Sequence, residues 1–479
     1  MKTISFIKPM SLMLLLLSLL SACNVKKVRE NSKPNVIYIL ADDLGYADLS
    51  CYGQTKFTTP NIDKLAAKGI KFTQHYSGST VCAPSRSALM TGQHTGHTYI
   101  RGNKGHSNEG QHPLRTEDFT IAELFKQNGY ATGAFGKWGL GYPNSSGDPI
   151  AKGFDEFYGY NCQRNAHSYY PWHLYNNNEK EILDNNAGDK KGTYAPIPIH
   201  EKAMAFIEKH SDEPFFLYYP NVIPHAELEV PESYMEKYRG KYLPEKEFKG
   251  VTSKNKRFRK GGYASQEESH AAFAGMINLM DEQVGEIMAK IEELGLTENT
   301  IIMFASDNGP HAAGGGDPEY FNSNGIYRGI KRDLYEGGIR VPFIVSWPET
   351  IAQGASSEHM SAFWDVLPTM ADILGADQPT NIDGISFLPT LLGKPQQEHE
   401  YLYWEFYERG GSQAIRKGNW KLVRTKVFKP SQTVTELFDI EKDPEETTDL
   451  SNEYPQIVSE LEELAKVTRT DSDIFKFKN

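Results

Sequence analysis

The chain has 479 residues, of which 39% are hydrophobic, and it carries a formal net charge of −11. A chain of this length can bury a large core, and it is expected to form one large domain with a smaller one, or two to three ordinary domains. The negative charge argues against a general affinity for nucleic acid or other polyanions, so an anionic substrate would have to be drawn by a local group of positive side chains.

Residues 1–22 are typical of a bacterial lipoprotein signal peptide. Lys2 and Lys8 give a positive start, and the apolar run over residues 10–20 is too short to span a bilayer. Small residues then precede Cys23, as in a lipobox, which predicts cleavage before Cys23 and lipidation of its thiol. An ordinary signal peptide that happens to contain a cysteine is the alternative. Both interpretations place the mature chain outside the cytoplasm, and the first makes it a periplasmic or outer-membrane-associated lipoprotein that meets the membrane only through its lipid anchor.

A short polar tether over residues 23–33 precedes a region in which apolar runs alternate with amphipathic segments. Short continuous apolar runs predict buried strands at residues 35–40, 130–135, 215–219, 300–305 and 343–347. Capping residues, stop signals and an apolar stripe predict helices at residues 61–68, 120–128 and 267–294. The first of these is expected to start on Asn61 as its capping residue. Buried strands that alternate with helices predict an α/β fold with a large, mostly parallel sheet flanked by helices.

The sequence pattern changes near residue 378. Short alternating segments predict strands of a small antiparallel sheet at residues 401–405, 412–416, 420–425 and 436–439, followed by a helix at residues 457–467. We therefore expect residues 34–377 to form the catalytic domain and residues 378–479 to form a C-terminal subdomain packed on it.

Acidic and amide side chains follow two of the predicted buried strands. Asp42 and Asp43 come directly after the first strand, and Asp307 and Asn308 follow the strand at 300–305. Asp-Asp alone is common in turns and caps, but the carboxyl ends of parallel strands meet at one edge of a sheet, where ligands bind. Four oxygen ligands together favour Ca²⁺ over Zn²⁺. The pattern predicts a calcium site at this edge.

The segment from Cys82 to Arg86 is the most specific motif in the chain. Pro84 suits the first turn of a helix, so Cys82 is expected at a helix N-terminus, where backbone N–H groups and the helix dipole favour an anion. By itself Cys82 could also be a structural or a reactive thiol. Cys51 and Cys162 could form a disulfide outside the cytoplasm or remain free, and both possibilities stay open.

Cys82-Ala83-Pro84-Ser85-Arg86, with Leu-Met-Thr-Gly at 89–92, resembles the maturation motif of type I sulfatases in the alkaline phosphatase superfamily. The resemblance covers roughly residues 34–450. It implies an alkaline phosphatase-like fold, oxidation of Cys82 to formylglycine by a sulfatase-maturating enzyme, and hydrolysis of sulfate esters. In the hydrated aldehyde one hydroxyl attacks sulfur and the second then expels sulfate, a release that serine could not perform.

The resemblance also implies roles for individual side chains. Formylglycine 82 would be a fifth metal ligand, and Arg86 would steady its diol. Lys137 and Lys331 lie in segments that resemble those whose lysines contact the sulfate. His225 resembles the histidine that protonates the departing alkoxide.

The chain departs from the family pattern at Gly139. The family commonly has Gly-Lys-Trp-His-Leu-Gly, whereas residues 136–141 read Gly-Lys-Trp-Gly-Leu-Gly, so the histidine thought to deprotonate the second hydroxyl is missing. Another group such as His75, His94 or His97 could deprotonate that hydroxyl, or water could do so. Alternatively, no group replaces the histidine and turnover is slow. The sequence leaves all three open.

Residues 159–172 are dense in aromatic and hydrogen-bonding side chains and are expected to form a substrate-recognition loop, with Arg164 and His167 facing a sugar. A purely structural loop is the alternative. Bacterial lipoprotein sulfatases that resemble this chain commonly act on sulfated glycans, so a glycan sulfatase is the expected function. A small-molecule arylsulfatase, a phosphonate or phosphate monoesterase, and a non-catalytic protein that binds sulfated glycans are the alternatives.

Overall fold

The computed structural model describes residues 33–477 except 108 and 252–261. The predicted signal peptide, Cys23 and most of the tether lie outside the described residues. The account below concerns the unit Pro34–Asn479, from which Met1–Lys33 is separate. Within the described part of the chain, no helix is both long enough and apolar enough to cross a bilayer.

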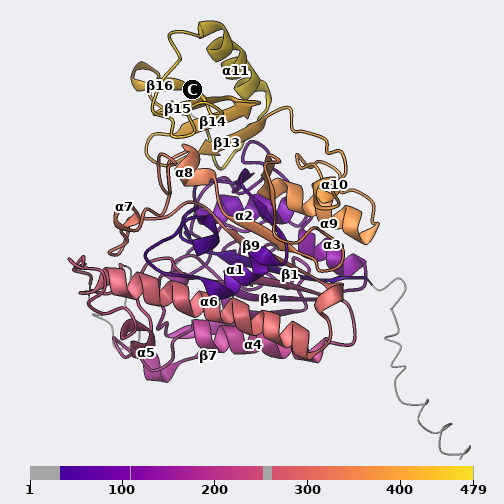
Figure 1. The fold of residues 1–479 in the computed structure, drawn as a ribbon, viewed down its shortest axis with the longest axis vertical. Coiled ribbons are helices and arrows are strands. Elements are labelled where there is room, and N and C mark those ends of the chain that lie inside the picture. Colours follow the sequence, from indigo (N-terminus) through magenta and orange to yellow (C-terminus); the bar gives the residue numbers. More distant parts are fainter. Residues whose placement is uncertain (1–32, 108, 252–261, 478–479) are drawn as a thin grey trace, which may run out of the picture. The chain divides into compact units, whose positions relative to one another are not determined.

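A ten-stranded sheet with the order β11-β2-β10-β9-β1-β8-β4-β5-β6-β7 lies at the centre of this unit (Figure 1). Its middle strands run parallel to one another: β9 (Thr300–Ser306), β1 (Asn35–Ala41), β8 (Phe215–Pro220), β4 (Ala131–Lys137) and β5 (Glu156–Tyr160). Towards the edges the pairing is mixed, and β10 is antiparallel to both its neighbours. The outer strands are β11 (Ala355–Ser357), β2 (Ile70–Phe72), β10 (Phe343–Ser346), β6 (His173–Asn176) and β7 (Glu179–Ile182).

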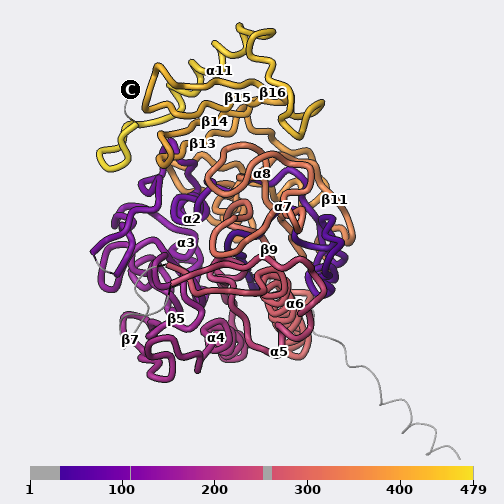
Figure 2. The backbone as a smooth tube through the Cα atoms, turned by 90° about the vertical axis from the view of Figure 1, so that its left-hand side faces the viewer, coloured from indigo at the N-terminus to yellow at the C-terminus, as the bar shows by residue number. Residues whose placement is uncertain are grey.

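Helices cover both faces of this sheet (Figures 1 and 2). Successive residues of a strand point to opposite faces, so Ile37 and Ile39 enter one core and Val36 and Tyr38 enter the other. The first core includes residues of α1 (Pro60–Ala67), α4 (Pro196–Lys209) and α6 (Ser269–Glu293). The second includes residues of α2 (Cys82–Thr91), α3 (Ile121–Gln127) and α9 (Val366–Leu374).

A second, four-stranded antiparallel sheet forms near the C-terminus (Figure 1). It consists of β13 (Leu402–Phe406), β14 (Ser412–Lys417), β15 (Trp420–Thr425) and β16 (Val434–Asp439). Leu422 on one face packs with Leu461 of α11 (Pro455–Val467), while Trp404 on the other packs with Trp364, just before α9. The remaining short elements are β3 (His75–Tyr76), β12 (Ser361–Ala362), α5 (Glu232–Met235), α7 (Pro318–Phe321), α8 (Glu336–Ile339) and α10 (Leu388–Leu391).

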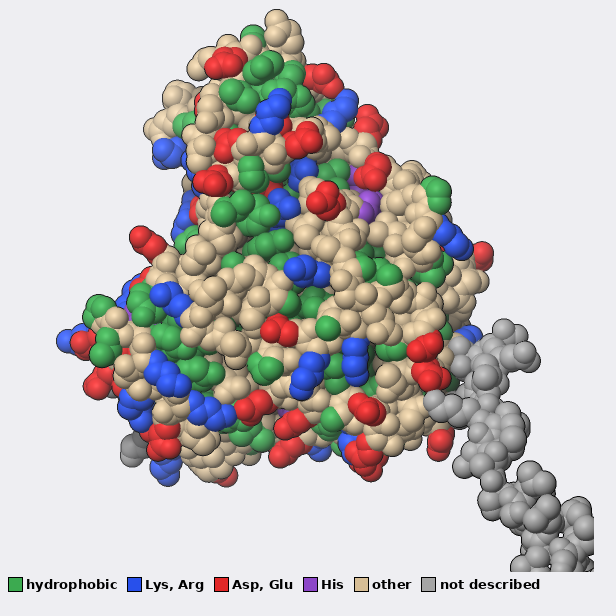
Figure 3. All heavy atoms as spheres, in the orientation of Figure 1, with side chains coloured by type: hydrophobic (Ala, Val, Ile, Leu, Met, Phe, Trp, Pro, Cys, Tyr) green, Lys and Arg blue, Asp and Glu red, His purple; other side chains and the backbone are tan. Residues whose placement is uncertain are grey.

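The predicted α/β fold with a small antiparallel sheet is confirmed, and the predicted strands and helices begin and end within two residues of the observed ones. One local prediction is wrong. The helix expected to start on a capping Asn61 begins at Pro60, and the Asn61 amide instead donates to Asp281 at 3.0 Å. On the face shown in Figure 3, acidic and basic side chains are interspersed over the surface.

Candidate active site

Polar side chains gather where four neighbouring parallel strands end. β9, β1, β8 and β4 are adjacent in the sheet and run in the same direction. Their carboxyl ends therefore meet at one edge, which is where open α/β sheets bind ligands. In sheet order these ends and the loops after them supply Asp307 and Asn308, Asp42 and Asp43, His225, and Lys137.

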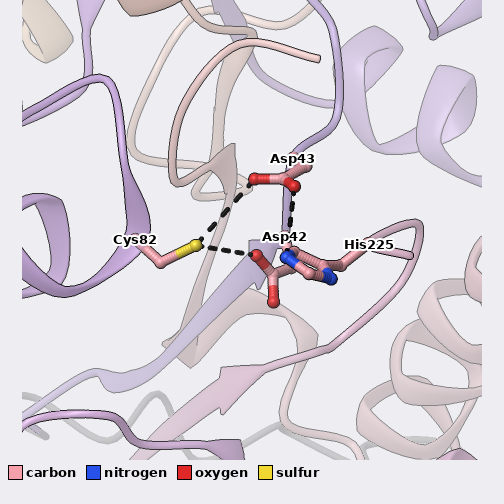
Figure 4. Close-up of side chains that lie close together, drawn as sticks. All are labelled: Asp42, Asp43, Cys82 and His225. Carbon is pink, nitrogen blue, oxygen red and sulfur yellow. Dashed lines mark hydrogen bonds and ion pairs between the residues drawn. The ribbon is translucent and has the colours of Figure 1, made fainter. Parts of the chain in front are cut away.

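Cys82 meets this edge from the N-terminus of α2, which begins at Cys82 itself and has Pro84 in its first turn. Its Sγ lies 3.3 Å from Oδ1 of Asp42 and 3.9 Å from Oδ1 of Asp43. Figure 4 shows Cys82 and His225 approaching the aspartate pair from opposite sides. The predicted placement of Cys82 at a helix start beside the acidic pair agrees with the structure.

Buried cations balance the buried carboxylates. Lys137 Nζ lies 2.6 Å from Oδ2 of Asp42, and Lys331 Nζ lies 2.6 and 2.7 Å from the two carboxylate oxygens of Asp43. Lys331 also approaches Cys82 Sγ at 3.4 Å. Both lysines are almost fully buried, so these charges are weakly screened by water.

Arg86 and Asp307 form the third ion pair. The guanidinium donates to Oδ2 of Asp307 through both Nε (3.0 Å) and Nη2 (2.8 Å). The remaining nitrogen, Nη1, donates to the backbone oxygen of Lys137 at 2.5 Å. Arg86 thus connects α2 to the ends of β9 and β4.

The surroundings shift the pKa of the Cys82 thiol and the pKa of Asp42 in opposite directions. Burial raises the pKa of the Cys82 thiol, and Asp307 and Asp42 raise it further. A thiolate is therefore disfavoured here, which argues against a simple reactive cysteine. Burial would also raise the pKa of Asp42, but the surrounding cations, Lys137 first among them, together outweigh it and hold that pKa well below its usual range. Asp307 has its pKa raised to about 6, mainly by burial and by Asp42.

The oxygen atoms of this cluster suit a hard divalent cation. Asn308 donates through Nδ2 to Asp43 Oδ1 at 2.7 Å, and its own Oδ1 is buried without a hydrogen-bond partner among the described residues. Ligand atoms of Asp42, Asp43, Cys82 and His225 all lie within 4.8 Å of one another. Carboxylate and amide oxygens in this number are typical of Ca²⁺ sites. The residues therefore fit the calcium expected from the sequence.

His225 lies between two further imidazoles that the sequence did not single out as a group. Its Nδ1 bonds the backbone oxygen of Ala226, and its Nε2 lies 3.4 Å from Asp43 Oδ2. The ring stacks on His167 with centroids 5.0 Å apart, and His311 lies 5.5 Å away on another side. Burial lowers the pKa of His225 well below its usual value, although Asp43 opposes this. His311 was missed, although it follows Asn308 by three residues.

The two residues of the expected substrate-recognition loop, His167 and Arg164, lie in different surroundings. This side chain joins the site by stacking on His225, whereas Arg164 is exposed just before the short turn Asn165–His167. Asn165 is tied down by Glu109, which accepts a hydrogen bond from its Nδ2 at 3.0 Å. Of the two residues predicted to face a sugar, His167 therefore lies beside the catalytic cluster.

Gly139 has a positive φ of 80°, and a Cβ placed there would overlap the side-chain amide of Gln163. Gln163 thus takes up the space next to Gly139. The histidines proposed as substitutes make other contacts: His75 bonds Ser361 Oγ at 2.8 Å and stacks on Phe343, while His94 and His97 face Asp383. In the described structure none of their recorded contacts joins them to the Cys82 cluster. The described cysteines, Cys51, Cys82 and Cys162, are all free thiols.

Comparison with known proteins agrees with this arrangement. The family model described as Sulfatase matches residues 34–376. The chain belongs to the sulfatase family. A second model, described as N-sulphoglucosamine sulphohydrolase, C-terminal, matches residues 325–471. This sulfatase is accordingly a sulfuric ester hydrolase.

Several of its relatives are named as sulfatases. It is 31% identical to the N-acetylgalactosamine-6-O-sulfatase of Bacteroides thetaiotaomicron over 95% of this chain and 97% of that protein. It is also 31% identical to human arylsulfatase A over 90% of this chain and 87% of the relative. The crystal structure of Ps i-CgsB matches with a TM-score of 0.74 at 28% identity, covering 91% of this chain and 93% of that one. The phosphonate monoester hydrolase of Agrobacterium radiobacter shares the fold at a TM-score of 0.63 and 20% identity, with coverages of 91% and 95%.

Proposed function

We propose that this sulfatase removes sulfate groups from glycans, using a formylglycine derived from Cys82 and a Ca²⁺ ion. The observation that carries the proposal is the position of Cys82, at the N-terminus of α2 and within 3.9 Å of both Asp42 and Asp43. Asp42, Asp43, Asp307 and Asn308 would hold the ion, with residue 82 as a further ligand. Calcium bound there would lower the pKa of the attacking hydroxyl and neutralise negative charge on the sulfate.

The hydrated formylglycine supplies one hydroxyl to attack sulfur and a second to expel sulfate. The chain's own residues prepare this position. The dipole of α2, whose N-terminus is at residue 82, favours negative charge at that position. Arg86 holds α2 against Asp307, so the attacking oxygen keeps its orientation.

Lys137 and Lys331 would bind the sulfate oxygens. Both ammonium groups are buried and already point at the aspartate pair, at 2.6 Å from the nearest oxygen in each case. Charge that builds on the sulfate oxygens in the transition state would meet cations that are already in place, which is an effective form of electrostatic stabilisation.

His225 would give a proton to the departing sugar oxygen. The bond from Nδ1 to Ala226 directs Nε2 towards the aspartate pair, so Nε2 carries the exchangeable proton. Asp43 favours the protonated ring, while burial opposes it. A ring that loses its proton easily is a strong acid once charged, which suits transfer to an alkoxide.

Support for a glycan substrate comes from the relatives and from one loop. The bacterial relative that matches nearly end to end is named N-acetylgalactosamine-6-O-sulfatase. Ps i-CgsB, which is 28% identical, was crystallised with k-i-k-neocarrahexaose. His167, from the aromatic loop at 159–172, lies beside His225 and would contact the sugar, with Arg164 nearer the loop surface. Human arylsulfatase A is equally identical, so an aryl sulfate is the competing substrate class.

The test is to produce the full chain together with a sulfatase-maturating enzyme and to measure conversion at Cys82 by peptide mass spectrometry. The matured protein is then assayed with calcium on N-acetylgalactosamine 6-sulfate, a panel of other sulfated mono- and oligosaccharides, 4-nitrophenyl sulfate and 4-nitrophenyl phosphate. We expect the highest kcat/KM on a sulfated sugar. Turnover of the aryl ester alone would exclude a glycan substrate from that panel, and faster phosphate hydrolysis would favour a phosphomonoesterase.

We also propose that the chain is anchored as a periplasmic or outer-membrane lipoprotein through Cys23. The support is the sequence of residues 1–23, with two early lysines, a short apolar run and small residues before the cysteine. Radiolabelled palmitate should be incorporated into the parent chain and not into Cys23→Ser. Equal labelling of the two proteins would contradict the anchor.

A further inference from the structure

The segment that carries Lys331 is held by the C-terminal subdomain. We call residues 328–335 the Lys331 loop; it leads directly into α8, which lies beneath the four-stranded sheet in Figure 1. Arg328 Nη1 lies 3.3 Å from Oε1 of Glu436, and Arg332 Nε lies 3.2 Å from Oε2 of Glu408. Both glutamates belong to the subdomain. Ion pairs with the subdomain therefore hold the Lys331 loop on each side of Lys331.

Beneath these half-exposed pairs lies a fully buried one. Lys421 of β15 places Nζ 2.8 Å from Oε1 of Glu336 and 2.9 Å from Oε1 of Glu446. Glu446 also accepts a hydrogen bond from the backbone N–H of Glu336 at 2.6 Å. On its other oxygen, Glu336 bonds Tyr76 Oη at 2.7 Å and lies 3.2 Å from Arg340 Nη1. Glu336, at the first position of α8, is thus fixed from both domains.

The backbone of α8 is in close contact with the segments that carry Asn308 and Lys331. The N–H of Gly309, next to Asn308, donates to the oxygen of Gly338 at 3.1 Å. A Cβ on Gly309 would overlap the oxygen of Gly337, and a Cβ on Gly338 would overlap the oxygen of Asp333. Such close backbone packing has no room for independent movement. A shift of α8 therefore moves both the Asn308 end of β9 and the Lys331 loop.

We propose that Lys421 is a positioning residue of the catalytic site, which acts through Glu336 on two elements at once, the Asn308 end of β9 and the Lys331 loop. This inference rests on the proposed roles of Asn308 and Lys331 in binding calcium and sulfate. Lys421 itself lies on β15 and forms ion pairs with Glu336 and Glu446.

The charge state of Glu336 supports a permanent link. Burial would raise the pKa of Glu336, but Lys421, Arg340 and Arg416 together outweigh it and lower the pKa to about 2. Glu336 is therefore ionised throughout the neutral range, and loss of Lys421 leaves a buried carboxylate beside Glu446 without its main counter-charge. Removal of one partner from a buried ion pair is more disruptive than removal of a surface pair.

The test compares four full-length, matured proteins: the parent chain, Lys421→Met, Lys421→Arg and Lys417→Met. Lys417 is the matched control, because it belongs to the same sheet and pairs with Glu460 at 2.8 Å, but it is partly exposed on the surface. Calcium alone is titrated calorimetrically into each metal-stripped protein, and KM and kcat are measured on 4-nitrophenyl sulfate at saturating calcium. Thermal unfolding shows whether each variant is folded at the assay temperature.

We expect Lys421→Met to bind calcium at least about tenfold more weakly and to raise KM several-fold while folded, consistent with the loss of supporting contacts around a metal site. Lys421→Arg should recover most of both quantities, and Lys417→Met should match the parent. A folded Lys421→Met with parental calcium affinity and KM overturns the proposal, even if its melting temperature is lower.

If Lys421→Met does not fold, the double variant Lys421→Gln/Glu446→Gln replaces both buried charges with neutral amides. It leaves Glu336 paired with Arg340 and Tyr76. The same weakening of calcium binding is expected, and a parental affinity overturns the proposal. Failure of the proposed function would show separately, as a parent chain that binds calcium but does not hydrolyse sulfate esters.

Discussion

Arg86 places two nitrogens, Nε and Nη2, on a single oxygen of Asp307, at 3.0 and 2.8 Å. This leaves the other carboxylate oxygen of Asp307 to accept the backbone N–H of Asp43 at 3.1 Å. One guanidinium therefore fixes the orientation of a carboxylate that in turn fixes the neighbouring strand end. The proposed metal ligands from β1 and β9 are held as one framework by a residue of α2.

Replacement of Arg86 by lysine should disable this framework, because an ammonium group cannot occupy the positions of three guanidinium nitrogens. We expect Arg86→Lys to lower kcat/KM on 4-nitrophenyl sulfate by at least about 100-fold and to reduce the free energy of unfolding by about 1–3 kcal/mol, the cost of an unsatisfied buried polar group. Steady-state kinetics and urea unfolding measure the two effects. Arg424→Lys, at a part-exposed pair with Glu462, is the control and should stay within about 0.5 kcal/mol of the parent. Parental activity in Arg86→Lys would show that catalysis does not need the two guanidinium contacts with Asp307.

His225 is expected to matter in proportion to the basicity of the leaving group. A sugar alkoxide needs a proton as it departs, whereas 4-nitrophenolate is stable without one. His225→Ala should therefore lower kcat on a sulfated sugar by about 10²–10⁴-fold, the usual contribution of a general acid, and should lower kcat on 4-nitrophenyl sulfate far less. His210→Ala, which removes a ring bonded to Glu213, should leave both values unchanged. An equal loss on the two substrates would assign His225 to sulfate binding or to the fold.

The buried Oδ1 of Asn308, which lacks a hydrogen-bond partner in the described structure, is the atom most clearly free to bind a cation. Asn308→Ala should weaken calcium binding by at least about tenfold, in line with the sensitivity of metal sites to loss of coordinating or supporting groups. Calorimetric titration of the metal-stripped protein measures this directly. Asn419→Ala, at an exposed contact with Glu441, is the matched control. Unchanged affinity in Asn308→Ala would remove Asn308 from the ligand set.

How far the sequence predicts the fold depends on burial. The run at 35–40 is apolar throughout because β1 is buried on both faces, and such runs stand out in a sequence. By contrast, β7 reads Glu-Lys-Glu-Ile and is exposed along its length, so it carries no apolar pattern. The end of β5 overlaps the expected substrate loop at residues 159–172, because Gly159 and the polar residues that follow resemble a turn more than a strand.

The same contrast holds within the site. Asp43 and Asp307 were predictable because each follows a buried strand, and parallel strands bring their ends together. The stacking of His167 and His311 around His225 depends on how three loops pack, for which no local pattern exists. Lys421 falls inside a predicted strand, and nothing in that strand's pattern indicates its contact with Glu336, which is far away in the sequence.

A further prediction concerns Gly139, the position where the family has a histidine. The side chain of Gln163 occupies the space that a side chain at position 139 would need. Gly139→His would place a side chain against the Gln163 amide and at a φ of 80°, which only glycine adopts readily. We expect this variant to unfold at a lower temperature and to show lower kcat than the parent, so the family motif would not restore faster turnover. The double variant Gly139→His/Gln163→Ala should recover part of the stability by relieving the overlap. A rise in kcat for Gly139→His alone would show that the site accommodates the histidine.

The last prediction concerns pH and the buried ion pair between His399 and Asp365. Burial alone would lower the pKa of His399, but Asp365, whose Oδ1 lies 2.8 Å from His399 Nε2, outweighs it together with Glu398 and Asp383 and raises the pKa. In the unfolded chain the same group titrates near its ordinary value, about 6.5. The stabilisation is therefore fully present below about pH 6.5 and is lost as the pH rises through the higher pKa of the folded state.

We accordingly expect His399→Gln to reduce the free energy of unfolding more at pH 5.5 than at pH 9 (about one unit below and well above the ordinary histidine value). The loss at the lower pH should be roughly 1.5–3 kcal/mol, as for a hydrogen bond to a charged group. Urea unfolding of the parent and the variant at both pH values measures the difference. His106→Gln, which replaces a ring stacked on Tyr142, is the control for the loss of an imidazole elsewhere. If His399→Gln lost the same stability at both pH values, the His399–Asp365 contact would be a neutral hydrogen bond and not an ion pair.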